Sequence, residues 1–91
     1  MPKFRKKPVV IEAEIVSGLI LNARDKWQAL PQWFRDAYER GGLIPRHDGI
    51  SVTTLEGTMN AEPTDWLIQG VKGEIYPCKP DIFEATYEAV E

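Results

Sequence analysis

Positively charged side chains and flat aromatic rings recur at positions that could together bind a small anionic molecule. A nucleotide-type ligand needs an aromatic surface for its base and cations or N–H groups for its phosphates. The sequence offers both kinds of group at its N-terminus and in its second half. The candidate ligand-binding residues are Arg5, Lys7, Trp66, Lys72, Tyr76 and Lys79.

The same aromatic residues have a second interpretation. Trp66 and Tyr76 flank a predicted hairpin, so they could be cross-strand core partners while Lys72 and Lys79 keep the hairpin soluble. A ligand pocket needs cations beside an aromatic platform, whereas a protein interface places Trp residues in an apolar patch with lysines at its rim. The sequence therefore leaves two function classes open: a non-catalytic ligand binder and a protein–protein interaction module.

Catalytic constellations are sparse. His47 is the single histidine and Cys78 the single cysteine, so nucleophile–base schemes and zinc sites all depend on these two residues. Lys79 could lower the pKa of the adjacent Cys78 thiol, although a lone cysteine is more often a buried packing residue. The glycines Gly70 and Gly73 fall in a predicted hairpin and do not form a phosphate loop. We expect no enzyme activity, no catalytic residues, no cofactor and no metal site.

Composition limits the partners. The net charge of −3 argues against general nucleic-acid binding, and no apolar run is long enough to span a bilayer. A single cysteine fits a reducing cytosol. Residues 3–7 are basic and residues 74–91 are mostly acidic. The two ends could neutralise one another, or the basic end could reach a phosphate-bearing ligand.

The first half of the chain predicts a strand followed by helices. Alternating apolar residues favour a strand over residues 8–16. Asn22 or Asp25 could begin a short helical turn that ends near Ala29. A main helix over residues 31–40 follows.

Proline and glycine mark the ends of that main helix. Pro31 suits a first helical position, and Gly41-Gly42 can end the helix in a left-handed conformation. We expect an apolar stripe on the helical segment that packs on a sheet. The stripe consists of Trp27, Leu30, Phe34 and Tyr38, and its predicted partners are Ile11, Ile15, Val52, Ile68 and Ile75.

The second half has the alternating pattern and close turn signals of a β-meander, which can curl into a small barrel. Predicted extended segments cover residues 43–46, 50–55, 58–61, 66–69 and 74–77. A short C-terminal helix should follow Pro80, with Asp81 as its cap and Glu84 completing a capping box. The predicted class is α+β, in one domain of residues 1–91. A chain this short has a thin core, so we expect a homo-oligomer.

Two segments carry a resemblance to a known family. Residues 4–13 read Phe-Arg-Lys-Lys-Pro-Val-Val-Ile-Glu-Ala, and residues 65–88 read Asp-Trp-Leu-Ile-Gln-Gly-Val-Lys-Gly-Glu-Ile-Tyr-Pro-Cys-Lys-Pro-Asp-Ile-Phe-Glu-Ala-Thr-Tyr-Glu. These resemble the N-terminal and C-terminal signatures of a family of small phage and prophage proteins. The resemblance implies a phage protein in the host bacterial cytoplasm and transfers no catalytic residues.

Phage provenance and small size also suggest two biological roles. Several unrelated phage proteins of this size are counter-defence sponges that sequester nucleotide immune signals, and this chain is similar to them in size and origin only. The alternative is an interaction module that contacts a host or phage protein without a ligand. Neither role involves a membrane.

Overall fold

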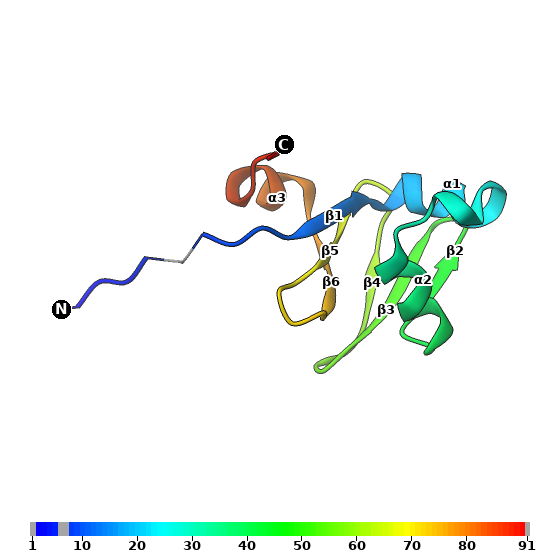
Figure 1. Ribbon diagram of the computed structural model, residues 1–91, viewed down its shortest axis with the longest axis horizontal. Coiled ribbons are helices and arrows are strands. Elements are labelled where there is room, and N and C mark those ends of the chain that lie inside the picture. The colour runs from blue at the N-terminus through cyan, green and yellow to red at the C-terminus, as the bar shows by residue number, and fades with distance from the viewer. Residues whose placement is uncertain (1, 6–7, 91) are drawn as a thin grey trace.

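The chain folds into two three-stranded antiparallel sheets and three α-helices (Figure 1), in a computed structural model that describes residues 2–5 and 8–90. This confirms the predicted α+β class. The first sheet has the order β1 (Glu12–Ile15), β5 (Trp66–Gln69), β6 (Ile75–Cys78). The second has the order β2 (Leu43–Arg46), β3 (Gly49–Thr54), β4 (Gly57–Ala61).

The sheets are not closed into a barrel, and the meander does not continue from β4 into β5. The chain leaves β4 through a turn that is bonded to the N-terminal half of the protein. Val16 N–H donates to Asp65 O at 2.9 Å, and Ser17 N–H donates to Pro63 O at 3.0 Å. These bonds hold the turn beside β1, so β5 pairs with β1.

The register of the first sheet gives it two different apolar faces. Ala13 lies opposite Ile68, and Ile68 lies opposite Tyr76. Because side chains alternate along a strand, Trp66 shares this face with Ile68 and Tyr76. Leu67 points to the other face, into the main core.

The predicted strand over residues 8–16 is wrong at both ends, since β1 covers only Glu12–Ile15 and Val16 already begins α1 (Val16–Asp25). Val16 and Leu19 are buried, and they form the inner side of an amphipathic helix that the prediction missed. Asn22 and Asp25 therefore lie inside and at the end of α1, where neither starts a helix. The short turn before Ala29 is confirmed as a 3-10 helix, η1 (Trp27–Ala29).

The predicted main helix is confirmed as α2 (Gln32–Glu39). Pro31 precedes its first residue with extended ψ, so it takes the N-cap position and not the first helical one. Gly41 has a φ of 81°, which confirms the left-handed end. The chain then turns sharply into β2.

The main core lies between the second sheet, the inner face of the first sheet, and the helices α1 and α2 (Figure 1). Its members are Val16, Leu19, Leu30, Trp33, Phe34, Ala37, Leu43, Ile50, Val52, Ala61, Leu67 and Ile75. The predicted core residues Val52 and Ile75 are confirmed. Ile15 is exposed and Ile68, although fully buried, lies outside this cluster.

The predicted helix stripe is half right. Leu30 and Phe34 are buried, whereas Tyr38 is exposed at 46% and packs edge-on to Trp27 with ring centroids 5.0 Å apart. Trp33 takes the core position instead. The buried side of α2 thus consists of Trp33, Phe34 and Ala37, while Tyr38 lies outside it.

The C-terminal helix is confirmed as α3 (Pro80–Thr86), but its predicted cap is wrong. Lys79 takes the N-cap position and no side chain bonds to the helix start. Pro80 has the fixed φ and missing N–H that suit a first helical position, so the helix begins one residue before Asp81 could cap it. Asp81 lies in the first turn, where its charge favours the helix dipole.

Candidate functional site

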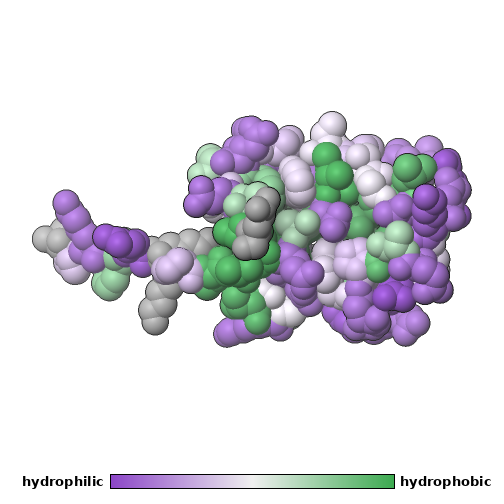
Figure 2. All heavy atoms as spheres, turned by 45° about the horizontal axis from the view of Figure 1, so that its top comes forward, coloured by the Kyte–Doolittle hydropathy of each residue, from purple (hydrophilic) through white to green (hydrophobic). Residues whose placement is uncertain are grey.

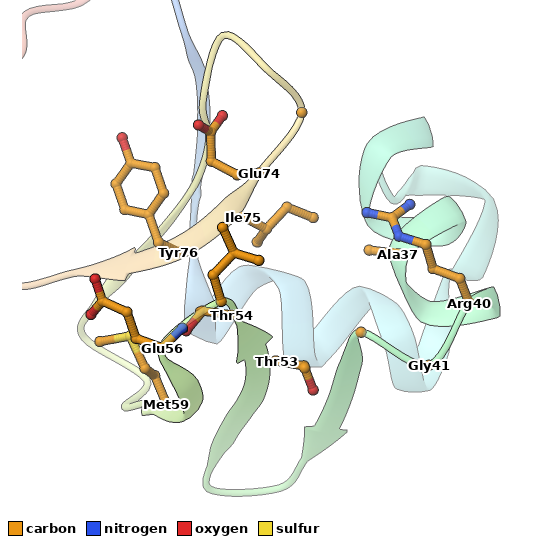
Figure 3. A pocket seen from close by; sticks show the side chains of 13 residues that line it. Ala37, Arg40, Gly41, Thr53, Thr54, Glu56, Met59, Glu74, Ile75 and Tyr76 are labelled. Carbon is orange, nitrogen blue, oxygen red and sulfur yellow. The ribbon is translucent and has the colours of Figure 1, made fainter.

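A cleft of about 690 Å³ lies where the two sheets approach each other (Figure 3). β6 is an edge strand of the first sheet and lies next to β3 and β4 of the second. The end of α2 and the β3–β4 hairpin complete the walls. The polar lining comes from Arg40, Thr53, Thr54, Glu56, Glu74 and Tyr76, and the apolar lining from Ala37, Leu55, Met59 and Ile75.

Arg40 stands on one wall because α2 ends there. Gly42 N–H donates to Ala37 O at 2.8 Å, and Thr53 N–H donates to Gly42 O at 2.9 Å, so the helix end is fixed onto β3. Within the described residues, the Arg40 guanidinium makes no hydrogen bond or ion pair. Because it has no such partner there, its planar set of N–H donors is available to bind a carboxylate or a phosphate.

The opposite wall carries Tyr76, Glu56 and Met59 (Figure 3). The hairpin turn at Glu56 is held by Thr54, whose Oγ1 donates to Gly57 O at 2.8 Å and accepts Glu56 N–H at 3.2 Å. The wall across from Arg40 is therefore fixed, acidic at Glu56 and aromatic at Tyr76.

Glu74 is turned toward the β5–β6 connection. Its Oε1 accepts the backbone N–H of Lys72 at 3.0 Å. Gly70 allows this arrangement because a Cβ at that position would collide with the Glu74 carboxylate. One of the two acidic groups of the cleft thus already has a hydrogen-bond donor.

Tyr76 connects the cleft to the far face of the first sheet. Its hydroxyl lies 3.4 Å from the hydroxyl of Tyr87. Burial, followed by this hydrogen bond, raises the pKa of Tyr76 from 10.0 to about 12. Like any tyrosine, the phenol is neutral at physiological pH, and it offers a ligand an apolar ring with no added negative charge.

Trp66 is engaged on this far face. Its ring stacks on Phe83 of α3, with centroids 4.2 Å apart and planes 7° from parallel. Phe83 in turn contacts Tyr87 at 5.3 Å. One side of the Trp66 ring is thus covered by the protein itself and serves to attach α3.

Lys79 also has a structural role. Its Nζ lies 3.2 Å from Asp65 Oδ2 and 3.9 Å from Glu62 Oε2. Asp65 is only 2% exposed, and the same oxygen accepts Glu62 N–H at 2.9 Å. Lys79 therefore compensates a buried carboxylate, and a phosphate would have to compete with Asp65 for it.

The structure does not gather the predicted ligand-binding residues into one cavity. Tyr76 lines the large cleft, whereas Trp66 lines a separate groove of about 300 Å³ beside α3. Arg5 belongs to the exposed N-terminal segment and Lys72 to the turn after β5. Lys7 lies outside the described residues.

Sequence reasoning missed Arg40, which is the cation of the large cleft. A signal was present, because Arg40 directly precedes the glycine pair that ends the main helix. The acidic partner across the cleft, Glu56, occupies a predicted hairpin turn and gave no comparable signal.

Cys78 and His47 do not show the signs of a catalytic pair. Burial, with Asp65 and Asp81 adding their negative charge, raises the pKa of the Cys78 thiol. The alternative in which Lys79 activates this thiol is not supported, because the lysine is directed to Asp65 and Glu62. His47 is exposed in the turn between β2 and β3. Among the described residues no group of acidic, His and Cys side chains could hold a metal ion.

Comparison of the chain with known protein families, curated proteins and solved structures finds no match. In residues 2–5 and 8–90, no helix has the length and apolar character needed to cross a membrane.

Proposed function

We propose that the protein is a non-catalytic binder of a small anionic molecule, which it holds in the cleft between Arg40 and Tyr76. The observation that carries the proposal is the Arg40 guanidinium, unpartnered within the described chain, on the wall opposite the Tyr76 ring. The cleft volume of about 690 Å³ is in the range of small-molecule sites.

The walls specify the chemistry of the ligand. Arg40 favours one carboxylate or phosphate, which it can bind through two parallel N–H donors. Tyr76 and Met59 favour a flat apolar part. Glu56 favours a hydrogen-bond donor and disfavours additional negative charge beside it. A molecule with a single phosphate and a base, such as a mononucleotide unit, meets all three conditions.

The biological role we propose is sequestration. The family resemblance of residues 4–13 and 65–88 supports a phage protein that acts in the host bacterial cytoplasm. A sponge needs a pocket that holds a signal without transforming it. The cleft fits that requirement, because it offers one cation, Arg40, and the neutral phenol of Tyr76. The thiol of Cys78, whose pKa is raised, does not line the cleft.

Thermal-shift measurements with adenosine 5′-monophosphate, adenosine and inorganic phosphate test the proposal. A bound ligand at a hundred times its dissociation constant stabilises the fold by about 2.7 kcal/mol. The monophosphate should stabilise the protein most, and Arg40→Gln should remove the gain. The matched control is Arg46→Gln, an exposed arginine on β2 outside the cleft lining. A gain that survives Arg40→Gln would place the ligand elsewhere.

One observation favours the interaction module as a second candidate. Leu55 is fully exposed at the tip of the β3–β4 hairpin, and Met59 beside it is 42% exposed. A partner protein could cover both residues at the rim of the cleft. Loss of a host or phage partner on Leu55→Asp, with no ligand-induced thermal shift, would favour this function.

A further inference from the structure

The described residues before β1, 2–5 and 8–11, belong to no helix or strand and are called the N-terminal arm. Figure 1 shows the arm running away from the two sheets, along the 50 Å long axis of the molecule. Phe4 is 94% exposed and Val10 is 74% exposed. Burying a phenylalanine side chain contributes about 1.5–3 kcal/mol, so the arm carries apolar surface that a second molecule could cover.

An apolar groove opens at the base of the arm. It has a volume of about 300 Å³, and its lining includes Val9 and Val10 of the arm and Phe83, Tyr87 and Val90 of the C-terminal segment. Figure 2 shows hydrophobic residues gathered where the arm leaves the body. The groove is therefore a small apolar receptor next to the α3 helix.

The arm and the rim of the groove have complementary charge. Residues 2–11 hold four basic residues and no acidic one, whereas residues 80–91 hold four acidic residues and no basic one. Glu88 lines the groove and Glu84 belongs to the adjacent helix α3, and both are exposed. In the described part of the chain, Lys3 and Arg5 make no ion pair with either of them. The two ends of one chain thus do not neutralise one another at these residues.

We propose that the arm of one chain docks into the groove of a second copy, and that the second copy returns the contact. In this two-fold dimer Phe4 fills the groove, and Lys3 and Arg5 face Glu84 and Glu88. In such a symmetric dimer, each copy buries the apolar arm of the other in its groove and pairs the basic residues of that arm with its own acidic residues.

A chain cannot easily place its own Phe4 in its own groove. Val9 forms a wall of the groove, and only residues 5–8 separate it from Phe4. The arm would have to reverse within those residues, where Pro8 favours an extended chain. A second copy avoids the reversal, since its arm can enter from outside.

Charge reversal in two separate variants tests the exchange by light scattering on the full chain. The arm variant is Lys3→Glu with Arg5→Glu, and the groove variant is Glu84→Lys with Glu88→Lys. Wild type should show twice the 10.3 kDa chain mass at micromolar concentration, while each variant alone should be a monomer. An equimolar mixture should restore the dimer, because the reversed charges at positions 3 and 5 then face the reversed charges at positions 84 and 88, while the second contact keeps the wild-type pairs.

Two controls complete the design. Lys26→Glu with Arg46→Glu makes the same charge change on exposed residues outside the groove and should leave the dimer intact. Phe4→Ala should weaken dimerisation about tenfold or more.

A monomeric wild type, dimers that survive both charge reversals, or a mixture that stays monomeric would each overturn the proposal. None of these residues lines the Arg40 cleft, so the outcome is independent of ligand binding.

Discussion

Lys79 Nζ lies 3.2 Å from Asp65 Oδ2, and this ion pair joins the start of α3 to the turn that directs β5 toward β1. The other carboxylate oxygen of Asp65 is buried with no partner in the described structure. A buried carboxylate with one satisfied oxygen depends strongly on the cation that remains. Lys79 is thus an element of the fold, in contrast to the ligand role that its position in the sequence indicated.

Replacement of Lys79 by alanine should therefore destabilise the protein. We expect the free energy of unfolding to fall by about 1–3 kcal/mol, because the Asp65 carboxylate loses its cation while staying buried. The matched control Lys72→Ala removes a lysine from an exposed turn and should change stability by less than about 0.5 kcal/mol. Urea denaturation measures both. Equal effects of the two substitutions would contradict the structural role of Lys79.

The stack of Trp66 on Phe83 should be measurable as a coupling energy. Stacked aromatic pairs contribute about 0.5–1.5 kcal/mol beyond the area that they bury. A double-mutant cycle with Trp66→Ala, Phe83→Ala and the double variant should give a coupling of this size. Strictly additive effects would mean that Phe83 does not hold α3 through Trp66.

Local sequence signals predicted much of the fold. The period of α2, the glycine pair after it and the hairpin turn at Glu56–Gly57 all act over a few residues, and each is confirmed. Helix α1 was missed because Val16 continues the alternating pattern of the preceding residues. The split into two sheets was missed because it depends on bonds from Val16 and Ser17 to a turn far along the chain.

The site was harder to predict than the fold. Tyr76 was identified, but Arg40 lines the same cleft only because the end of α2 is fixed onto β3. Lys72 and Lys79, which are near Tyr76 in the sequence, do not line the cleft, and Lys79 pairs with Asp65 instead. Sequence proximity therefore indicated the chemistry of a ligand site but not its members.

The ionisation of Tyr76 predicts a pH dependence of stability. The pKa of Tyr76 is raised from 10.0 to about 12 in the folded protein. Between these values the unfolded chain loses the proton that the folded chain keeps, so stability falls as the pH rises. Tyr76→Phe should give a shallower fall over this range in denaturation measured at a series of pH values. Identical slopes for both proteins would contradict the burial of Tyr76.

Cys78 should react slowly with thiol reagents. Its pKa is raised, chiefly by burial, so the thiolate fraction near neutral pH is smaller than that of an ordinary cysteine. We expect alkylation by iodoacetamide to be slower than that of a free cysteine peptide at the same pH and to reach the peptide rate in urea. Faster reaction in the folded protein would indicate an activated thiol.

The central claim is that the ligand lies between Arg40 and Tyr76, and amide chemical shifts measured by NMR test it most directly. Titration with adenosine 5′-monophosphate should shift the amides of the cleft walls, above all Gly41, Gly42, Thr53 and Glu56. Those near Lys79 and in the N-terminal arm should stay unchanged, and Arg40→Gln should abolish the response. Shifts confined to α3 and the arm, or no shifts at saturating monophosphate, would contradict the claim.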